Sequence, residues 1–354
     1  MNPLRNFQAP LLRNFPPPLG EGQGGGFFIW WLIKLVVLVG VLLVVLLVPA
    51  LFSAFFTLSI GVQSLILGIA AASIIFLNSV AGMVSLAQTA LYGVAGYTAA
   101  KLAVEQGFDP WLAALLAIAV TVAVALILGA VSSRSEGIYF LMITLASAVI
   151  TYYFFSQVTA FGSHEGINGV SPPALLGKPF VDPTGMYYAA LIAATLVYVL
   201  IWYLRRTPFG YALQGVRDEP TRMRALGFNV PLLRTAAFAV GAVLAAIAGV
   251  LLVWYNSNIS PGAIDLTRTI ELLEIAVIGG LGRLEGAWLG ALLFTLMDTY
   301  TRGYTDRFET LVGLLFLAVV LASPGGLAGL AATIDRWVRR RFREKVVIPA
   351  AEST

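Results

Sequence analysis

Two groups of residues in this chain could do chemistry: three acids that interrupt apolar stretches, and one charged connection between two such stretches. The acids are Glu271, Glu274 and Asp298. An ionised carboxylate deep in a bilayer costs on the order of 3 kcal/mol, so such groups usually pair, face water or carry a proton. Arg268 is spaced to pair with Glu271, and Glu271 and Glu274 share a helix face. Two interpretations stay open: structural pairing or exposure near the membrane surface, and the coupling of transport to an ion.

The numbers of Cys and His residues disfavour enzymatic and metal chemistry. The chain has no Cys and a single His, His164, so it lacks a thiolate nucleophile, a Cys-ligated metal and a His-rich zinc site. It also lacks a GxxxxGK(S/T) phosphate loop, so it does not bind ATP in that way. We expect no catalytic residue, no metal site and no cofactor bound by this chain.

The composition excludes a soluble globular protein. Hydrophobic residues make up 59% of the 354 residues and charged residues 11%, with a mean hydropathy of +0.87, against roughly 25% charge in soluble domains. So many apolar residues must face lipid or one another inside a membrane. We expect an all-α polytopic membrane protein embedded in the lipid bilayer, with no nucleic-acid partner.

Apolar segments define the membrane domain, which we place at residues 27–333. Ten segments are predicted, at 27–52, 55–78, 79–101, 111–133, 138–161, 185–204, 232–256, 266–282, 286–301 and 308–332. A crossing needs about 20 residues, so 266–282 and 286–301 are short and could instead form a re-entrant pair. Polar residues interrupt 79–101. We predict eight to ten transmembrane helices and prefer ten.

Basic residues predict the sidedness. With ten crossings and a cytoplasmic N-terminus, sixteen of the 22 Lys and Arg residues fall on the cytoplasmic side, five fall outside and Lys34 lies in the first segment. This skew follows the positive-inside rule, so both termini are expected in the cytoplasm. The tails are a flexible Pro- and Gly-rich segment, 1–26, and a basic segment, 334–354, that would attract anionic lipid headgroups.

The longest cytoplasmic connection, residues 205–234, is the most informative stretch. Apolar residues at 209, 212, 213 and 216 recur at helical spacing, which predicts a short helix with an exposed apolar edge. A second short helix would begin at Pro220 and stop at Gly227. Such a pair is typical of a docking surface for a cytoplasmic protein. The alternative is a solvated charged loop that only fixes the protein's orientation.

Uncharged polar residues at lipid depth predict a path for a solute. They are Gln63, Asn78, Ser85, Gln88, Tyr92, Thr144 and Ser147. Neutral hydrogen-bonding groups suit a neutral or zwitterionic solute that is passed on and not held tightly. The alternative for each residue is helix–helix packing, since Ser, Thr and small residues fulfil that role in many membrane proteins.

Five stretches form an ordered set: LNSVAGMVSLAQTALYGVAGYTAA, SRSEGIYFLMITLA, EGINGV, GYALQGVRDEPTRMRALGFNVPLLRTAAF and TIELLEIAVIGGLGRLEGAWLGALL. In this order they resemble the permease subunits of branched-chain amino-acid ABC importers, over about residues 58–325. A close sister group imports urea and short amides, and the sequence does not separate the two.

The resemblance implies a transport subunit in the inner membrane of a bacterium or archaeon. Two ATP-binding subunits would hold ATP and Mg²⁺, and a second related permease chain and an extracytoplasmic solute-binding protein would complete the importer. The residues expected to contact the ATP-binding subunits are Arg217, Asp218, Glu219, Arg222, Leu226 and Gly227. The rival is an ion-coupled secondary transporter that uses Glu271, Glu274 or Asp298.

Overall fold

The computed structural model describes residues 46–175, 178–179, 182–301, 308–323, 325–330 and 333. The tail 1–26, most of the segment 27–52 and the tail 334–354 lie outside the described residues, so the predictions made for them stay predictions. Residues Val48–Thr333 form one compact unit.

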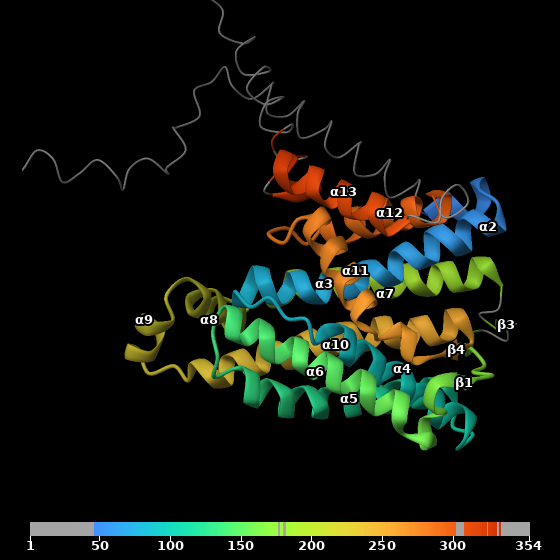
Figure 1. The fold of residues 1–354 in the computed structure, drawn as a ribbon, viewed down its shortest axis with the longest axis horizontal. Helices are drawn as coiled ribbons and strands as arrows, with labels where there is room; N and C mark the ends of the chain where they lie inside the picture. Colours follow the sequence, from blue (N-terminus) through green and yellow to red (C-terminus); the bar gives the residue numbers. More distant parts are fainter. Residues whose placement is uncertain are drawn as a thin grey trace, which may run out of the picture. The chain divides into compact units, whose positions relative to one another are not determined.

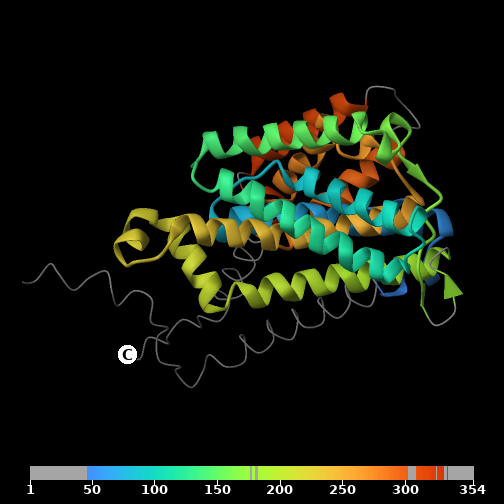
Figure 2. The same cartoon turned by 90° about the horizontal axis from the view of Figure 1, so that it is seen from below.

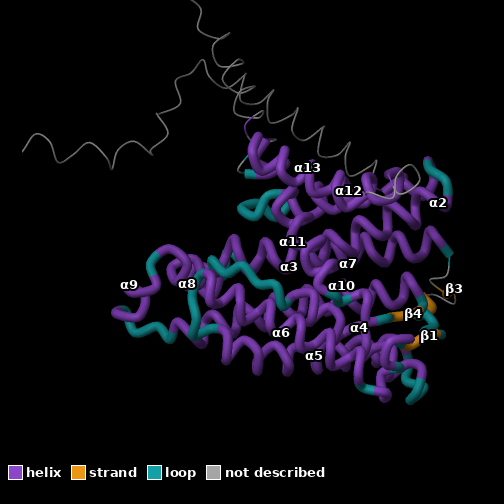
Figure 3. Tube along the Cα trace, viewed as in Figure 1, coloured by secondary structure: helices purple, strands orange, loops and turns teal. Residues whose placement is uncertain are grey.

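Helices dominate the described residues, as expected for an all-α membrane protein (Figures 1 and 3). The α-helices are α2 Ala54–Phe56, α3 Gln63–Ala81, α4 Gln88–Val104, α5 Pro110–Ser132, α6 Ile138–Gln157, α7 Pro183–Leu204, α8 Pro208–Asp218, α9 Pro220–Ala225, α10 Val230–Asn256, α11 Leu266–Gly279, α12 Gly286–Thr301 and α13 Phe308–Ala322. A π-helical stretch, η2 Thr57–Val62, joins α2 to α3, and short 3-10 turns lie at η3 Thr159–Phe161, η4 Ser163–Glu165 and η5 Pro261–Ala263. The short strands are β1 Ile167–Asn168, β2 Ala174–Leu175, β3 Lys178–Pro179 and β4 Asn258–Ile259.

Proline sets the start of many of these helices. It occupies the first turn of α5, α7, α8, α9 and α10, where its fixed φ suits the helix and its missing N–H costs no hydrogen bond. At α10 the side chain of Asn229 also accepts a hydrogen bond of 3.2 Å from Leu232 N, which caps the helix. The start predicted at Pro220 is therefore confirmed.

Five described helices are long and apolar enough to cross a membrane: Ala54–Ala81, Pro110–Ser132, Ile138–Gln157, Pro183–Leu204 and Val230–Asn256. The helices α4, α11, α12 and α13 have 17, 14, 16 and 15 residues. At 1.5 Å per residue they are about 21–26 Å long, less than the roughly 30 Å hydrocarbon core. Ten crossings therefore stay a prediction.

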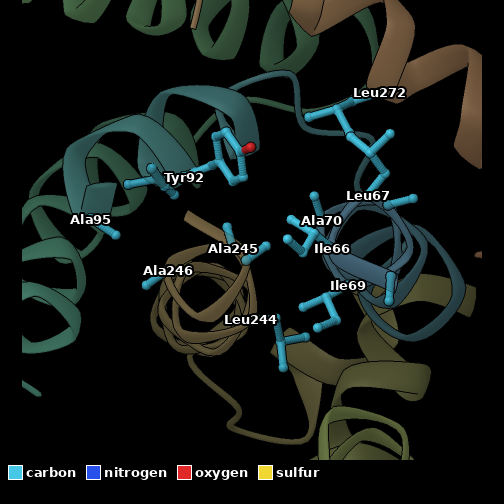
Figure 4. Packing of buried hydrophobic residues seen from close by; sticks show 14 of the residues in the cluster. Ile66, Leu67, Ile69, Ala70, Tyr92, Ala95, Leu244, Ala245, Ala246 and Leu272 are labelled. Atoms are coloured by element: carbon cyan, nitrogen blue, oxygen red, sulfur yellow. The ribbon is translucent and has the colours of Figure 1, made fainter. Parts of the chain in front are cut away.

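The helices form an inner and an outer set. The most apolar windows of Ala54–Ala81 and α10 are 83% and 67% buried, whereas those of α5, α6 and α7 are 28% buried. Figure 4 shows Ile66 and Ile69 of α3 turned toward Leu244 and Ala245 of α10 at the centre of the bundle. The outer helices turn large apolar side chains outward, as helices that face lipid do.

The segment predicted as one crossing at 79–101 is broken. Gly82 ends α3 in the left-handed conformation, at φ +69°, and Met83 N donates to the Leu77 carbonyl at 3.1 Å, which is the pattern of a glycine-terminated helix. Residues 82–87 are then non-helical before α4 begins. The polar residues that weaken this segment in the sequence mark the break.

The bundle has two distinct ends (Figure 1). We call the end that carries α8 and α9 the loop end, and the end that carries β1 and β4 the strand end. There β1 and β4 pair antiparallel, with Ile167 opposite Ile259. A Cβ on Gly166 would overlap the Ile259 carbonyl oxygen, so the EGINGV loop needs glycine at this position.

Helices α11 and α12 pack backbone to backbone. A Cβ on Gly279 would overlap the Gly286 carbonyl oxygen, and one on Gly290 would overlap the Ile275 carbonyl oxygen. Small residues allow this close approach. The connection between the two helices lies near the end of α3, where Asn78 Nδ2 donates to the Leu281 carbonyl at 3.1 Å.

Candidate functional site

The 205–234 loop folds as the two predicted short helices, and it projects from the bundle at the loop end (Figures 1 and 2). The Thr207 side chain accepts a hydrogen bond of 3.2 Å from Gly210 N and so caps α8. The Gln214 amide donates to the carbonyls of Arg205 and Gly210, both at 3.2 Å. These bonds fix α8 to the end of α7.

The prediction of an exposed apolar edge on α8 is wrong. Leu213 and Val216 are both fully buried, because this face of α8 packs against α3 and α10. The exposed apolar side chains of the loop are Tyr211, Leu226 and Phe228. The exposed part of the loop is therefore the outer side of α8 and the end of α9.

Arg217 is exposed over 37% of its side chain, but its guanidinium reaches back to the end of α3. Its Nη1 donates to the Ser79 carbonyl, one of the last carbonyls of α3, and its Nε donates to Asp218 Oδ1 at 2.9 Å. Its side chain also lies against Gly82, where a Cβ would come within 2.5 Å of Arg217 Cγ. Arg217 therefore joins α8 to the point at which α3 ends.

The other five predicted contact residues are exposed as well. They are Asp218, Glu219, Arg222, Leu226 and Gly227. Gly227 follows α9 with φ +89°, and no described heavy atom lies within 4 Å of where its Cβ would be. Glycine is therefore favoured at position 227 by the positive φ and not by crowding from neighbouring atoms. The structure thus places these residues together on one projecting surface.

Glu136 is a functional candidate at the loop end that no motif in the sequence singles out. Its Oε1 accepts from Arg224 Nη2 of the α9 helix at 3.1 Å and from Arg234 Nη1 of α10 at 2.9 Å. Arg234 is buried, with 10% of its side chain exposed, and Thr235 Oγ1 donates to Ser133 Oγ nearby at 3.0 Å. The turn between α5 and α6 is therefore tied to the base of the loop. No sequence pattern pairs residues so far apart, although Glu136 lies within the SRSEGIYF stretch.

The structure gathers part of the predicted solute path. Thr144 Oγ1 accepts a hydrogen bond of 3.2 Å from Leu86 N, which brings Thr144 of α6 next to Ser85 and Gln88. Tyr92 lies one turn further along α4, and Figure 4 shows its side chain pointing toward the helices that carry Leu67 and Leu272.

Gln63 and Asn78 lie at opposite ends of one helix. Because Gln63 and Asn78 are fifteen residues apart on one helix, or about 22 Å, they cannot both lie beside Gln88. The amide of Asn78 is bonded to the α11–α12 connection.

Gln88 is the most unusual of these residues. It is fully buried, and neither Nε2 nor Oε1 of its amide has a hydrogen-bond partner among the described residues. The neighbouring Thr89 is 1% exposed, and its Oγ1 likewise has no partner there. Buried polar groups are nearly always hydrogen-bonded in folded proteins, so these two side chains differ from an ordinary helix interface.

Three hydroxyl groups of α6 donate hydrogen bonds to carbonyl oxygens of the same helix. Thr144, Ser147 and Thr151 donate to the carbonyls of Leu141, Ile143 and Ser147 at 2.8–2.9 Å. These bonds agree with the packing interpretation for Ser147. The Thr144 hydroxyl donates within its own helix and also accepts the hydrogen bond from Leu86 of the broken segment.

The sequence of this chain matches a known protein family. The family described as the permease component of the branched-chain amino acid transport system matches residues 56–324. That range covers more than half of the chain and runs from η2 to α13. The chain belongs to this permease family. No solved structure matches the chain.

Individual relatives are similar to parts of this permease chain. The permease protein LivM of Salmonella typhimurium is 25% identical over 270 residues, which are 70% of this chain and 64% of LivM. LivH of the same organism is 25% identical over 202 residues, 53% of this chain and 64% of LivH. BraD of Pseudomonas aeruginosa is 31% identical over 142 residues, 39% of this chain and 46% of BraD. The chain thus spans less than two thirds of the length of these relatives.

The three acids singled out in the sequence are all at least half-buried. Arg268 Nη1 donates to Glu271 Oε2 at 2.7 Å, and 15% of the Glu271 side chain is exposed. The predicted pairing is therefore present. Glu274 and Asp298 are half-buried. Among the described residues no group of three or more His, Asp or Glu could hold a metal ion.

Two cavities open on the permease bundle. The larger, about 1200 Å³, lies between α5, α7 and α10 and has a mainly apolar lining. The smaller, about 310 Å³, lies at the loop end between Tyr198, Gln214 and Glu285. Neither of these two is lined by a residue of the predicted solute path. That path is closed around Gln88 in the conformation described.

Proposed function

We propose that this chain is the membrane-spanning subunit of an ATP-driven importer of branched-chain amino acids. The observation that carries the proposal is the family match over residues 56–324, which includes the membrane helices and the α8–α9 loop together. The relatives LivM, LivH and BraD are each named as a permease protein of a high-affinity branched-chain amino acid transport system. Amino-acid import is therefore favoured over the import of urea or short amides.

The chain works with partners. ATP and Mg²⁺ bind to two separate ATP-binding subunits, and an extracytoplasmic solute-binding protein delivers the amino acid. A second, related permease forms the other half of the channel. Support for a paired permease comes from Salmonella typhimurium, in which both LivM and LivH carry the permease name.

The loop 205–234 is the contact for the ATP-binding subunits. Its exposed residues Asp218, Glu219 and Arg222 supply charges of both signs, and Leu226 supplies an apolar contact. Exposed charges of both signs speed the approach of a partner and fix its orientation. A buried apolar contact in the interface supplies affinity. Closure of the ATP-binding subunits on ATP would then move α8 and α9.

Two connections carry that movement into the bundle. Arg217 joins α8 to the end of α3 through the Ser79 carbonyl and Gly82, and Glu136 joins α9 and α10 to the turn before α6. Because residues 82–87 lie between Gly82 and the hydrogen bond from Leu86 to Thr144, both connections reach the same broken segment. This segment is the gate of the solute path that we assign to Ser85, Gln88, Tyr92 and Thr144.

The membrane arrangement follows from the same assignment. The loop end faces the cytoplasm, and the strand end faces the solute-binding protein. We keep ten crossings with both termini inside, in the inner membrane of a bacterium or archaeon, and α11 and α12 as two shortened helices that meet near Asn78. The short β1–β4 pair lies on the outer side.

The energy source tests the proposal directly. Uptake of radiolabelled leucine should survive a protonophore while ATP is held constant, and it should stop when ATP is depleted. The variants Glu271→Gln and Glu274→Gln should retain uptake, because an ATP-driven permease needs no coupling carboxylate. Uptake that collapses with the proton gradient at constant ATP would replace this function by ion-coupled transport through these acids.

A further inference from the structure

The buried amide of Gln88 lies at a junction of three helices. Its Nε2 would be 3.4 Å from a Cβ on Gly241 of α10, and the same Cβ would be 3.2 Å from Leu77 of α3. Gly241 is eleven residues from the start of the 27-residue α10, about 16 Å along a helix of about 40 Å. The amide is therefore deep inside the bundle, at a depth where transporters place solute sites beside broken helices.

The local backbone explains why the amide and the Thr89 hydroxyl lack partners. A Thr inside a helix usually donates to the carbonyl four residues earlier, as Thr121 does to Ala117 at 2.7 Å. Residue 85, four before Thr89, belongs to the non-helical segment 82–87. The break thus leaves Gln88 and Thr89 beyond the reach of the helix's own acceptors, and no described side chain replaces them.

A purely structural role does not fit these two residues. A Leu at position 88 would fill the same volume without the cost of burying an unpaired amide, and the surrounding residues Leu77 and Gly241 are apolar. Gln214 shows the structural alternative, because its amide donates two hydrogen bonds that fix α8. Polar groups kept without partners in a core are typical of sites that act on something else.

We propose that the Gln88 amide and the Thr89 hydroxyl form a binding site for the ammonium and carboxylate groups of a small zwitterionic amino acid in transit. This inference rests on the proposed import function. An amide presents a donor and an acceptor side by side, and a hydroxyl can act as either. Nε2 can donate to a carboxylate while Oε1 accepts from an ammonium, and neither group carries a net charge that would hold one end of the solute.

Access to the site depends on the segment 82–87. Gln88 is fully buried and Thr89 is 1% exposed, so the site is closed in this conformation. The segment is held at one end by Arg217 of the α8 helix and at the other by Thr144. A movement of α8 therefore opens the site, and the apolar side chain of the solute would pass among residues such as Leu77.

The test compares uptake with stability in the complete importer, reconstituted in liposomes with its ATP-binding subunits, second permease and binding protein, with leucine as the probe. Gln88→Leu should lower leucine uptake about tenfold or more, because the solute loses both hydrogen-bonding partners. Its melting temperature should stay unchanged or rise, since an unpaired polar group is removed. Thr89→Val should lower uptake at an unchanged melting temperature, and Gln88→Asn should restore a substantial part of the uptake.

Two matched variants serve as controls. Thr121→Val removes a buried hydroxyl that is bonded within its own helix, so it should leave uptake near the wild-type rate. Gln214→Leu removes a satisfied amide and should lower the melting temperature, which calibrates what a structural glutamine does.

The failure of the proposed binding site and the failure of the proposed import function would give different results. Uptake by Gln88→Leu within twofold of wild type would overturn the site, as would a drop in its melting temperature comparable to that of Gln214→Leu. A wild-type complex that hydrolyses ATP but moves no leucine would instead overturn the proposed substrate.

Discussion

At the scale of single residues, Arg217 and Gly82 form the smallest unit of the account. The guanidinium of Arg217 binds a carbonyl at the end of α3, and its Cγ lies where a Cβ on Gly82 would be. Gly82 is also left-handed, at φ +69°. One glycine therefore ends a membrane helix and leaves room for the side chain that connects that helix to the loop.

Gly82→Ala tests this contact, with Gly107→Ala as the control. Both glycines have a positive φ, +69° and +65°, but no described atom lies within 4 Å of a Cβ at Gly107. Each variant should lose about 1–2 kcal/mol of unfolding free energy from the left-handed backbone. Only Gly82→Ala should also displace Arg217 and lower uptake, by about tenfold. Equal stability and equal uptake in the two variants, measured by thermal unfolding and leucine uptake, would remove the contact from the account.

At the scale of elements, the turn between α5 and α6 acts as a clamp on the base of the loop. The Glu136 carboxylate forms ion pairs with Arg224 of α9 and with Arg234 of α10, and the Arg234 side chain is nearly buried. Because α6 begins at Ile138 and carries Thr144, this turn lies between the loop and the broken segment 82–87.

Glu136→Ala should weaken that clamp. The loss of two charge-assisted hydrogen bonds, one of them to a nearly buried Arg234, should cost about 1–2 kcal/mol of unfolding free energy. ATP hydrolysis should continue while uptake falls severalfold, because the loop and α6 no longer move together. Glu105→Ala is the matched control, since Glu105 is also half exposed and pairs with Lys101 at 3.7 Å on the strand end; it should change stability by less than about 0.5 kcal/mol. If the two variants behave alike, the clamp has no role in coupling.

Local signals in the sequence were enough for some elements and not for others. The helices α8 and α9 follow from their prolines, the apolar spacing and Gly227, all of which act within a few residues. The break at 82–87 is only partly encoded: Gly82 and the polar residue Ser85 mark it, whereas Met83, Val84 and Leu86 resemble residues of a membrane helix. The pairing of Glu136 with Arg224 and Arg234 joins residues 88 and 98 positions apart, and no periodicity records such a pair. The burial of Leu213 and Val216 was missed because a helical pattern does not say which surface covers its apolar face.

At the scale of the whole molecule, the distribution of charge agrees with the proposed orientation. The described residues of the loop end include eight basic residues, Arg134, Arg205, Arg206, Arg217, Arg222, Arg224, Arg234 and Arg283, and those of the strand end include three, Lys101, Lys178 and Arg268. Positive charge gathers on the cytoplasmic side of membrane proteins. The loop, its clamp and the connection between α11 and α12 would therefore face the ATP-binding subunits.

Single cysteines test that orientation, and the absence of Cys from the natural sequence makes each one a clean reporter. Asp218→Cys lies on the loop surface and Glu165→Cys on the strand end, and both positions are exposed. In intact cells a membrane-impermeant maleimide should label Glu165→Cys within minutes and Asp218→Cys only after permeabilisation. The reverse pattern would invert the molecule and place the loop beyond the reach of any ATP-binding subunit.

If this chain is the permease of an ATP-driven importer, it must be bound to the other subunits in the membrane, so its partners are the most direct test. The tagged chain should be isolated from its native membranes in a mild detergent, and the stoichiometric partners identified by mass spectrometry. We expect ATP-binding subunits and a second related permease in the complex, and we expect the ATP-binding subunits to be lost from a variant with Asp218, Glu219 and Arg222 all changed to Ala. A chain that is isolated alone, or only with copies of itself, would contradict the account.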